Sequence, residues 1–284
     1  MDRRTRIALW GAAAGFMTLV GLWLAAVATD AAGPLDRAAS DGFAGLLGPR
    51  TGLLAQGIVH LADPAVFLLV ATGLIVVALL QHRPRLALAV SLILVGANVT
   101  TQLLKPALAE PRFADLLGGA QVGAVSWPSG HSTAAMSLAL CAILVAPSRL
   151  RPLVAPIGAA YAICIGYGLI AIVSHYPSDV FGGYLMAGTW TLLGVAGLWA
   201  AESRWPVNTG RTAGRAAVMR ARDAITPTAI AAAAAVAAAG LVAVARPGET
   251  LAYLQDHTIF GVVAVALATL AASLVATLAV VLRR

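Results

Sequence analysis

The sequence contains few charged residues. Only 11% of its 284 residues are charged, whereas an ordinary soluble domain carries about 25%. In contrast, 60% of the residues are hydrophobic and the mean hydropathy is +0.87. This composition argues against a soluble globular protein and predicts an integral membrane protein.

Cysteine and clustered carboxylates are also scarce. The two cysteines, Cys141 and Cys164, fall within apolar segments and have neither metal-binding nor redox spacing, so we expect both to be buried and structural. Since no group of neighbouring carboxylates could hold a metal, we expect no cofactor. The net charge of +7 comes from basic residues dispersed among loops, a pattern that does not indicate nucleic-acid binding.

Long apolar segments dominate the chain. A membrane-spanning helix needs about 20 such residues, and eight segments qualify, although His60 and Asp63 interrupt the start of the second. The sequence therefore predicts an all-α polytopic membrane protein. The predicted spans are residues 7–28, 62–80, 86–104, 129–146, 153–173, 180–200, 228–245 and 259–282.

Basic residues predict the orientation, because they concentrate on the cytoplasmic side of membranes. With both termini inside, 14 of the 19 Lys and Arg residues are cytoplasmic. These are Arg3, Arg4, Arg6, Arg83, Arg85, Arg149, Arg151, Arg204, Arg211, Arg215, Arg220, Arg222, Arg283 and Arg284, which leaves Arg37, Arg50, Lys105, Arg112 and Arg246 outside.

The remaining segments suggest a division of the chain into parts. Residues 29–61 form an external segment, in which apolar residues at helical spacing among Asp36, Arg37 and Asp41 predict a short amphipathic helix on the outer interface. We expect a six-span core over residues 1–200, a basic cytoplasmic linker over 201–227 and an accessory transmembrane hairpin over 228–284.

Three polar clusters fall at the ends of apolar segments on the predicted outer face. Lys105 ends the third span, Ser129-Gly130-His131 begins the fourth, and the segment from His175 to Asp179 precedes the sixth. Ionisable groups near lipid are costly and usually mark a working site. The convergence of three segments on one face predicts a single site.

Pro128-Ser129-Gly130-His131 is typical of a helix start, with Ser129 as the N-cap. Gly130 would let a ligand approach the backbone, and the amides of the first helical turn attract anions, phosphate above all. His131 would lie beside that anion. The alternative is a capped helix with an interfacial histidine.

His175 and Asp179 are spaced so that the carboxylate can return to the imidazole. A carboxylate that fixes one ring nitrogen prepares the other to act as a nucleophile, although an interfacial salt bridge explains the same spacing. Lys105 and Arg112 could stabilise the equatorial oxygens of a phosphoryl group during its transfer. The alternative for these two cations is anchoring to lipid headgroups.

Together the clusters resemble the signature of the type 2 phosphatidic acid phosphatase family. The family pattern is Lys, six residues and Arg-Pro, then Pro-Ser-Gly-His, then Ser-Arg, five residues, His, three residues and Asp. This chain has KPALAEPR, PSGH and GLIAIVSHYPSD in that order, within roughly residues 1–200. The resemblance implies that His175 forms a phosphohistidine, that Asp179 orients it and that His131 is the general acid. It also implies a phosphate cradle of Lys105, Arg112, Ser129 and the Gly130 amide, without a metal.

The chain departs from the family pattern at two places. Arg112 is followed by Phe113 and has its proline before it, and Gly168-Leu169 replace Ser-Arg. The loss of a charge-assisted contact of this kind costs about 2.7–4 kcal/mol in transition-state stabilisation, or about 100- to 1000-fold in rate. Arg37, Arg50 and Arg246 are candidates to replace the missing arginine.

Three functions fit these observations. The first is hydrolysis of a phosphomonoester or pyrophosphate on an isoprenoid or glycerolipid at the outer leaflet of the cell (plasma) membrane, with the site facing the outside or periplasm. The second is transfer of the phosphoryl group to another lipid or a glycan. The third is binding or transport of a phosphorylated lipid without hydrolysis, with the 228–284 hairpin as a docking surface for protein partners.

Overall fold

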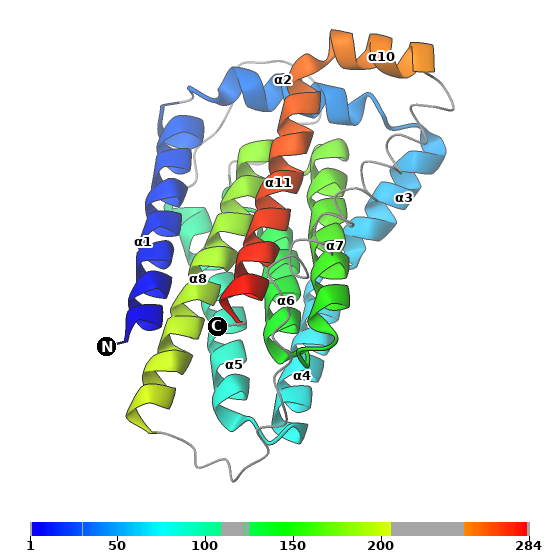
Figure 1. Ribbon diagram of the computed structural model, residues 1–284. Helices are drawn as coiled ribbons and strands as arrows, with labels where there is room; N and C mark the ends of the chain where they lie inside the picture. The colour runs from blue at the N-terminus through cyan, green and yellow to red at the C-terminus, as the bar shows by residue number, and fades with distance from the viewer. Residues whose placement is uncertain (1, 30, 109–121, 123–124, 206–246, 283–284) are drawn as a thin grey trace.

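The computed structural model describes residues 2–29, 31–108, 122, 125–205 and 247–282, and throughout these ranges the regular elements are helices. Figure 1 shows them as a bundle of roughly aligned helices with shorter helices across its upper end. The elements are α1 (Arg3–Trp23), continued by the π-helix η1 (Leu24–Ala28), then α2 (Gly33–Ala44), α3 (Pro49–His60), α4 (Pro64–Leu80), α5 (Pro84–Ala107), α6 (Gly130–Val145), α7 (Arg151–Ala171), α8 (Pro177–Arg204), α10 (Pro247–Asp256) and α11 (Thr258–Val281).

In the described ranges helices lie over the predicted spans, although α6, at 16 residues, is shorter than a helix that crosses a membrane. Within the described ranges, five helical segments are long and apolar enough to cross a membrane: α1 with η1, α5, α7, α8 and α11. Helices α3 and α4, bent by 45° at their junction, form a sixth when they are counted as one span. The prediction of an all-α, multi-pass membrane protein is confirmed. The predicted span over 228–245 lies outside the described residues.

Prolines and polar caps define where the helices begin. Proline occupies one of the first two positions of α4, α5, α7 and α8, where its missing N–H has no helical partner to lose. At α6, the Ser129 side chain accepts a hydrogen bond from the Ser132 backbone nitrogen at 3.3 Å. These starts place the polar residues of the sequence at helix ends.

Helix α6 lies at the centre of the bundle, against α4, α5, α7, α8 and α11. Nearly all its residues from Ser132 onward are buried, which accounts for an apolar sequence on every side of a helix of only 16 residues. Helix α8 approaches it closely at Gly183. A Cβ atom there would lie 2.8 Å from the Ser129 carbonyl oxygen and 2.9 Å from the Thr133 nitrogen.

Helix α11 packs directly on the other helices, against α7, α2, α6 and α8. Leu267, Ala271 and Val275 are completely buried in this contact, and the Tyr167 hydroxyl donates a hydrogen bond to the Ala264 carbonyl oxygen at 2.5 Å. The division into a core, a linker and an accessory hairpin stays a prediction, because most of the linker and the first predicted hairpin span lie outside the described residues.

Two local expectations differ from the structure. The segment 29–61, which was predicted to be external and to form one amphipathic helix, contains two helices, α2 and α3. Cys141 is buried as expected, whereas Cys164 is exposed on α7, so the expectation of two buried thiols is wrong for Cys164. Cys164 lies on the side of α7 that faces away from the packed interior.

Candidate active site

The chain direction brings the predicted site residues to one end of the bundle. Helices α5 and α7 end at the upper end in Figure 1, where α6 and α8 begin. Lys105, His131 and His175 therefore lie at this end. The arginines near the starts of α1, α5 and α7 and at the end of α8 lie at the other. There Arg85 donates a hydrogen bond to the Trp205 carbonyl oxygen at 2.5 Å.

Hydrogen bonds fix the geometry of the third motif. His175 Nδ1 lies 3.2 Å from Asp179 Oδ2, and the same oxygen accepts a hydrogen bond from the Tyr176 backbone nitrogen at 3.0 Å. The side chain of His175 is 8% exposed and that of Asp179 is completely buried. Asp179 thus holds the ring in one orientation from the first turn of α8.

The turn that leads into His175 is strained. Val173 has a φ of 56°, an unfavourable conformation for a β-branched residue. The backbone nitrogens of Ser174 and His175 both donate to the Leu169 carbonyl oxygen, at 3.0 and 3.3 Å. Such strain persists only where the surroundings determine the conformation, and it is concentrated at functional sites.

The second motif contacts the first and the third. The Ser129 backbone nitrogen donates to the Asp179 carbonyl oxygen at 3.0 Å, which joins the start of α6 to the start of α8. A Cβ atom at Gly130 would lie 3.2 Å from Gln102 Nε2 and 3.7 Å from Lys105 Nζ. The ammonium group of Lys105 therefore lies near the first turn of α6, whose amides favour an anion.

His131 has a carboxylate partner that the sequence analysis missed. Its Nε2 lies 3.2 Å from Asp63 Oδ1, while Asp63 Oδ2 lies 2.8 Å from His60 Nδ1. Asp63 stands between α3 and α4, outside both helices. Hydrogen bonds from His60 and His131 hold the pKa of the Asp63 carboxyl below its ordinary value, so the group is negatively charged at neutral pH. In the sequence, the interruption of the second predicted span by His60 and Asp63 was the signal that could have indicated this partner of His131.

Electrostatic interactions connect the groups across the site. The charges of His175 and Lys105 both act on His131, and that of Asp179 acts on Lys105. The structure thus brings together six of the seven predicted site residues: Lys105, Ser129, Gly130, His131, His175 and Asp179. Arg112 lies outside the described residues.

The position of the missing arginine is occupied by a packed leucine. Leu169 is completely buried in an apolar cluster that includes Val59 of α3 and Ala135 of α6. A Cβ atom at Gly168 would lie 3.0 Å from Val59 Cγ2. Helix α3 therefore packs against the segment that carries Ser-Arg in the family pattern.

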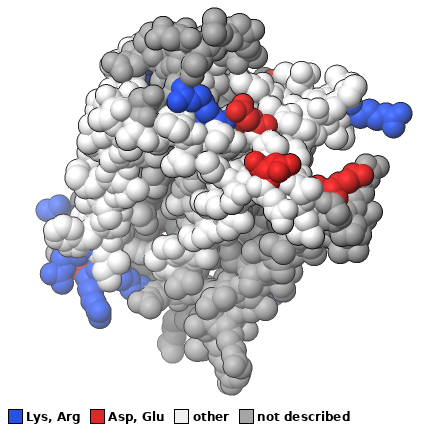
Figure 2. Space-filling model, turned by 90° about the horizontal axis from the view of Figure 1, so that it is seen from above, with Lys and Arg blue, Asp and Glu red and all other residues white. Residues whose placement is uncertain are grey.

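The candidates to replace this arginine lie on α2 and α3 or outside the described residues. Arg37 is half-buried on α2 and Arg50 is exposed at the start of α3, while Arg246 is not described. Figure 2 looks down on the end of the bundle with α2 and α10, where a few charged side chains of both signs lie on a mostly uncharged surface. Replacement of the arginine by one of these residues stays a prediction.

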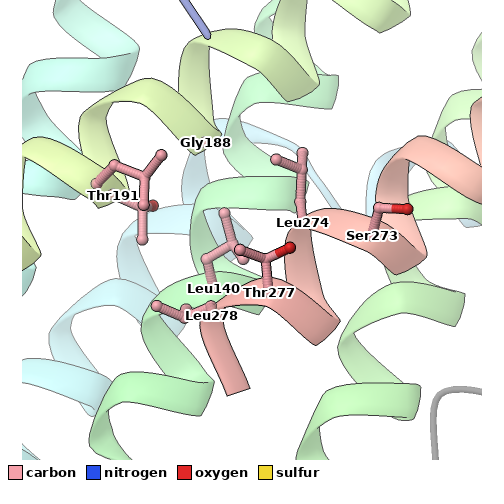
Figure 3. A pocket seen from close by; sticks show the side chains of 8 residues that line it. Leu140, Gly188, Thr191, Ser273, Leu274, Thr277 and Leu278 are labelled. Carbon is pink, nitrogen blue, oxygen red and sulfur yellow. The ribbon is translucent and has the colours of Figure 1, made fainter. Parts of the chain in front are cut away.

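A cavity elsewhere in the bundle has no catalytic groups. It has a volume of about 110 Å³ and lies between α6, α8 and α11, with Leu140, Leu274 and Leu278 in its lining (Figure 3). Leu140 follows Gly130 by about 15 Å of helix, so this cavity is distant from the histidines. In the described part of the chain, no group of three or more His, Cys, Asp or Glu side chains could hold a metal ion.

The site thus lies at one end of the bundle. It combines two imidazoles, each beside a carboxylate, with an ammonium group near the N-terminus of α6. Residues 85–203 match the family model described as the PAP2 superfamily, which confirms the predicted resemblance. No curated protein matches the sequence.

The fold is similar to a solved structure, "Crystal structure of the first transmembrane PAP2 type phosphatidylglycerolphosphate phosphatase from Bacillus subtilis". The TM-score is 0.53 at 20% sequence identity, and the similarity covers 71% of this chain and 100% of that chain. At this identity the likeness is one of fold, and it agrees with the helical membrane architecture described above.

Proposed function

We propose that this protein is a membrane lipid phosphatase that hydrolyses a phosphomonoester or pyrophosphate through a phosphohistidine on His175. The observation that carries this proposal is the pairing of His175 with Asp179 beside His131 and Lys105. The match of residues 85–203 to the PAP2 superfamily model supports phosphatase chemistry in general. The geometry gives each group a role that the chemistry needs.

The first step transfers the phosphoryl group to the enzyme. Asp179 accepts a hydrogen bond from the Nδ1–H group of His175, so the lone pair of Nε2 is directed at phosphorus. A bond forms between Nε2 and phosphorus as the bond from phosphorus to the leaving oxygen breaks. The protonated ring of His131 donates its proton to this oxygen, which departs as a lipid alcohol or, from a pyrophosphate, as a lipid monophosphate.

The second step regenerates the enzyme. A water molecule attacks phosphorus, neutral His131 accepts its proton, and the bond from phosphorus to His175 breaks to release inorganic phosphate. Lys105 and the first-turn amides of α6 stabilise the equatorial oxygens in both steps, together with Arg112. Ser129 contributes by capping α6, which keeps these amides directed at the phosphate.

The arrangement in the membrane determines which lipids have access. The arginines of the α4–α5 and α6–α7 turns lie at the end opposite the histidines, and basic residues favour the cytoplasmic side. In our proposal the site therefore faces the outside or periplasm, both termini are cytoplasmic, and the substrate is drawn from the outer leaflet of the plasma membrane. Isoprenoid phosphates, phosphatidic acid and phosphatidylglycerol phosphate have suitable headgroups.

Phosphate release from these three lipids, measured with the purified wild-type protein and His175→Ala, tests the proposal. We expect release by the wild type and at least a 1000-fold lower rate, to order of magnitude, for the variant. Equal rates would remove His175 from the mechanism. Binding of a lipid without any release would identify a binder, whereas labelled phosphate on an added alcohol would identify a transferase.

A further inference from the structure

Asp63 has an unusual arrangement for a residue that precedes a helix. It stands at the N-cap of α4, where aspartate commonly accepts a hydrogen bond from the first turn, yet its side chain makes no such bond. Its two oxygens instead lie 3.2 Å from His131 Nε2 and 2.8 Å from His60 Nδ1. The position of this carboxylate between two imidazoles depends on the packing of α4 against α6 and of α3 against α7.

The contact between Asp63 and His131 parallels that between Asp179 and His175. In each pair a carboxylate oxygen lies 3.2 Å from one ring nitrogen, Nε2 in His131 and Nδ1 in His175. The nitrogens that these contacts leave for a substrate are His131 Nδ1 and His175 Nε2. In each ring a carboxylate thus holds one nitrogen and leaves the other for the substrate. A general acid and a nucleophile on either side of a phosphoryl group require this arrangement.

The charges around His131 show what the carboxylate adds. Burial lowers the pKa of His131 below its ordinary value, and the positive charge of Lys105 on α5 acts in the same direction, so both disfavour an imidazolium. Asp179 interacts with His175 and Lys105, and His60 shares the carboxylate of Asp63. In the described part of the chain, Asp63 is the carboxylate in direct contact with His131, and it favours the protonated ring that a general acid must be.

We propose that Asp63 is the positioning residue of the general acid, which directs His131 Nδ1 toward the leaving oxygen and stabilises the imidazolium. His60 holds the second oxygen of Asp63 and so restricts rotation of the carboxylate. This role rests on the phosphatase function proposed above. It concerns one half of the reaction, protonation of the leaving group, which makes it separable from the function as a whole.

The test compares two phosphomonoesters whose leaving groups differ in basicity. An alkyl ester, such as a lipid phosphate, needs a proton on its leaving oxygen, whereas a 4-nitrophenyl ester does not. For Asp63→Asn we expect kcat/KM on the alkyl ester to fall by about 10- to 100-fold, part of what a general acid contributes, and on the aryl ester to change by less than about threefold. The alkaline limb of the pH–rate profile for the alkyl ester should move to lower pH.

Two further variants serve as controls. Asp41→Asn removes an exposed carboxylate of α2 and should leave both rates unchanged. Asp63→Glu retains the negative charge and should recover part of the alkyl rate. Thermal unfolding in detergent checks that the Asp63 variants remain folded.

The outcomes separate the two proposals. An inactive wild type on both esters would overturn the phosphatase function and with it this role. An active wild type in which Asp63→Asn lowers both rates equally, or neither, would overturn the role of Asp63 alone. Loss of the alkyl rate without a shift in the pH profile would refute stabilisation of the imidazolium and leave orientation as the remaining effect.

Discussion

Asp36 on α2 accepts two hydrogen bonds from Ser178 in the first turn of α8. Its Oδ1 lies 3.0 Å from the Ser178 backbone nitrogen and its Oδ2 lies 2.6 Å from the Ser178 hydroxyl, and both residues are buried. Ser178 directly precedes Asp179, the partner of His175. Helix α2 is thus fixed to the turn that orients the proposed nucleophile.

Replacing Asp36 should therefore affect both stability and rate. In Asp36→Ala the buried N–H and hydroxyl of Ser178 lose an acceptor, so we expect the free energy of unfolding to fall by about 1–3 kcal/mol. Phosphate release should fall as the turn before Asp179 loosens. Denaturant unfolding and a phosphate assay measure the two effects, and Asp41→Ala on the exposed side of α2 is the matched control. An unchanged midpoint would show that α2 does not stabilise this turn.

Asp179→Asn should impair the orientation of His175 without impairing the folding of the protein. The amide oxygen can still accept the hydrogen bond from the Tyr176 nitrogen, while the negative charge beside His175 Nδ1 is lost. By analogy with the loss of an orienting aspartate in other enzymes, we expect the rate to fall by about 100- to 10 000-fold. Rapid-quench trapping of the phosphohistidine should show slower formation, with little change in the unfolding midpoint. Unaltered formation would refute the orienting role.

Replacing Leu169 with the arginine of the family pattern should not increase activity. Leu169 is completely buried among apolar side chains, so the guanidinium of Leu169→Arg would enter an interior without a partner. We expect a loss of about 3–5 kcal/mol in the free energy of unfolding and no gain in rate. Leu169→Met conserves volume and should cost less than about 1.5 kcal/mol. A folded Leu169→Arg protein with at least tenfold higher activity would contradict this expectation.

Two glycines of the site should respond differently to alanine. In Gly130→Ala the methyl group meets the flexible ends of Gln102 and Lys105, so stability should change little while displacement of the ammonium group lowers the rate by up to about 100-fold. In Gly183→Ala the methyl group meets the backbone of α6, so the free energy of unfolding should fall by about 1–3 kcal/mol. Melting curves and kcat/KM for both variants check the contrast, and the reverse pattern would contradict it.

The proposed histidine nucleophile should make the reaction independent of added metal. Phosphate release should be the same before and after dialysis against a chelator, because Lys105 and helix amides supply the positive potential. Orthovanadate, which resembles the pentacoordinate phosphoryl group, should inhibit competitively in the wild type and bind much more weakly to Lys105→Gln. Loss of activity on chelation, recovered with a divalent ion, would contradict the proposed mechanism.

Local features of the site could be predicted from the sequence. The His175–Asp179 contact joins residues four positions apart, and the Ser129 cap reaches its own first turn. The apolar segments predicted the helices in the same way, because hydropathy along the chain determines burial in lipid. Each of these features depends on neighbours within one or two helical turns.

Contacts between distant segments could not be predicted. Asp63 and His131 are separated by 68 positions, and Asp36 and Ser178 by 142. Asp36 was assigned to the polar face of an interfacial helix, yet only 4% of it is exposed, because α2 packs against α8. Helix α3 was missed although Gly48-Pro49 is a helix-start signal. Hydrophobic periodicity indicates which side of a helix is buried, but it does not identify the helix against which that side packs.

The burial of α11 has a consequence for biosynthesis. Leu267, Ala271 and Val275 are synthesised after α6, α7 and α8, yet they fill the interior between these helices. Helices α6, α7 and α8 therefore remain in the membrane with one flank uncovered until α11 is made. A ribosome that stops after residue 204 would release a bundle with an open flank, so the proposed catalytic unit is completed only when α11 is inserted.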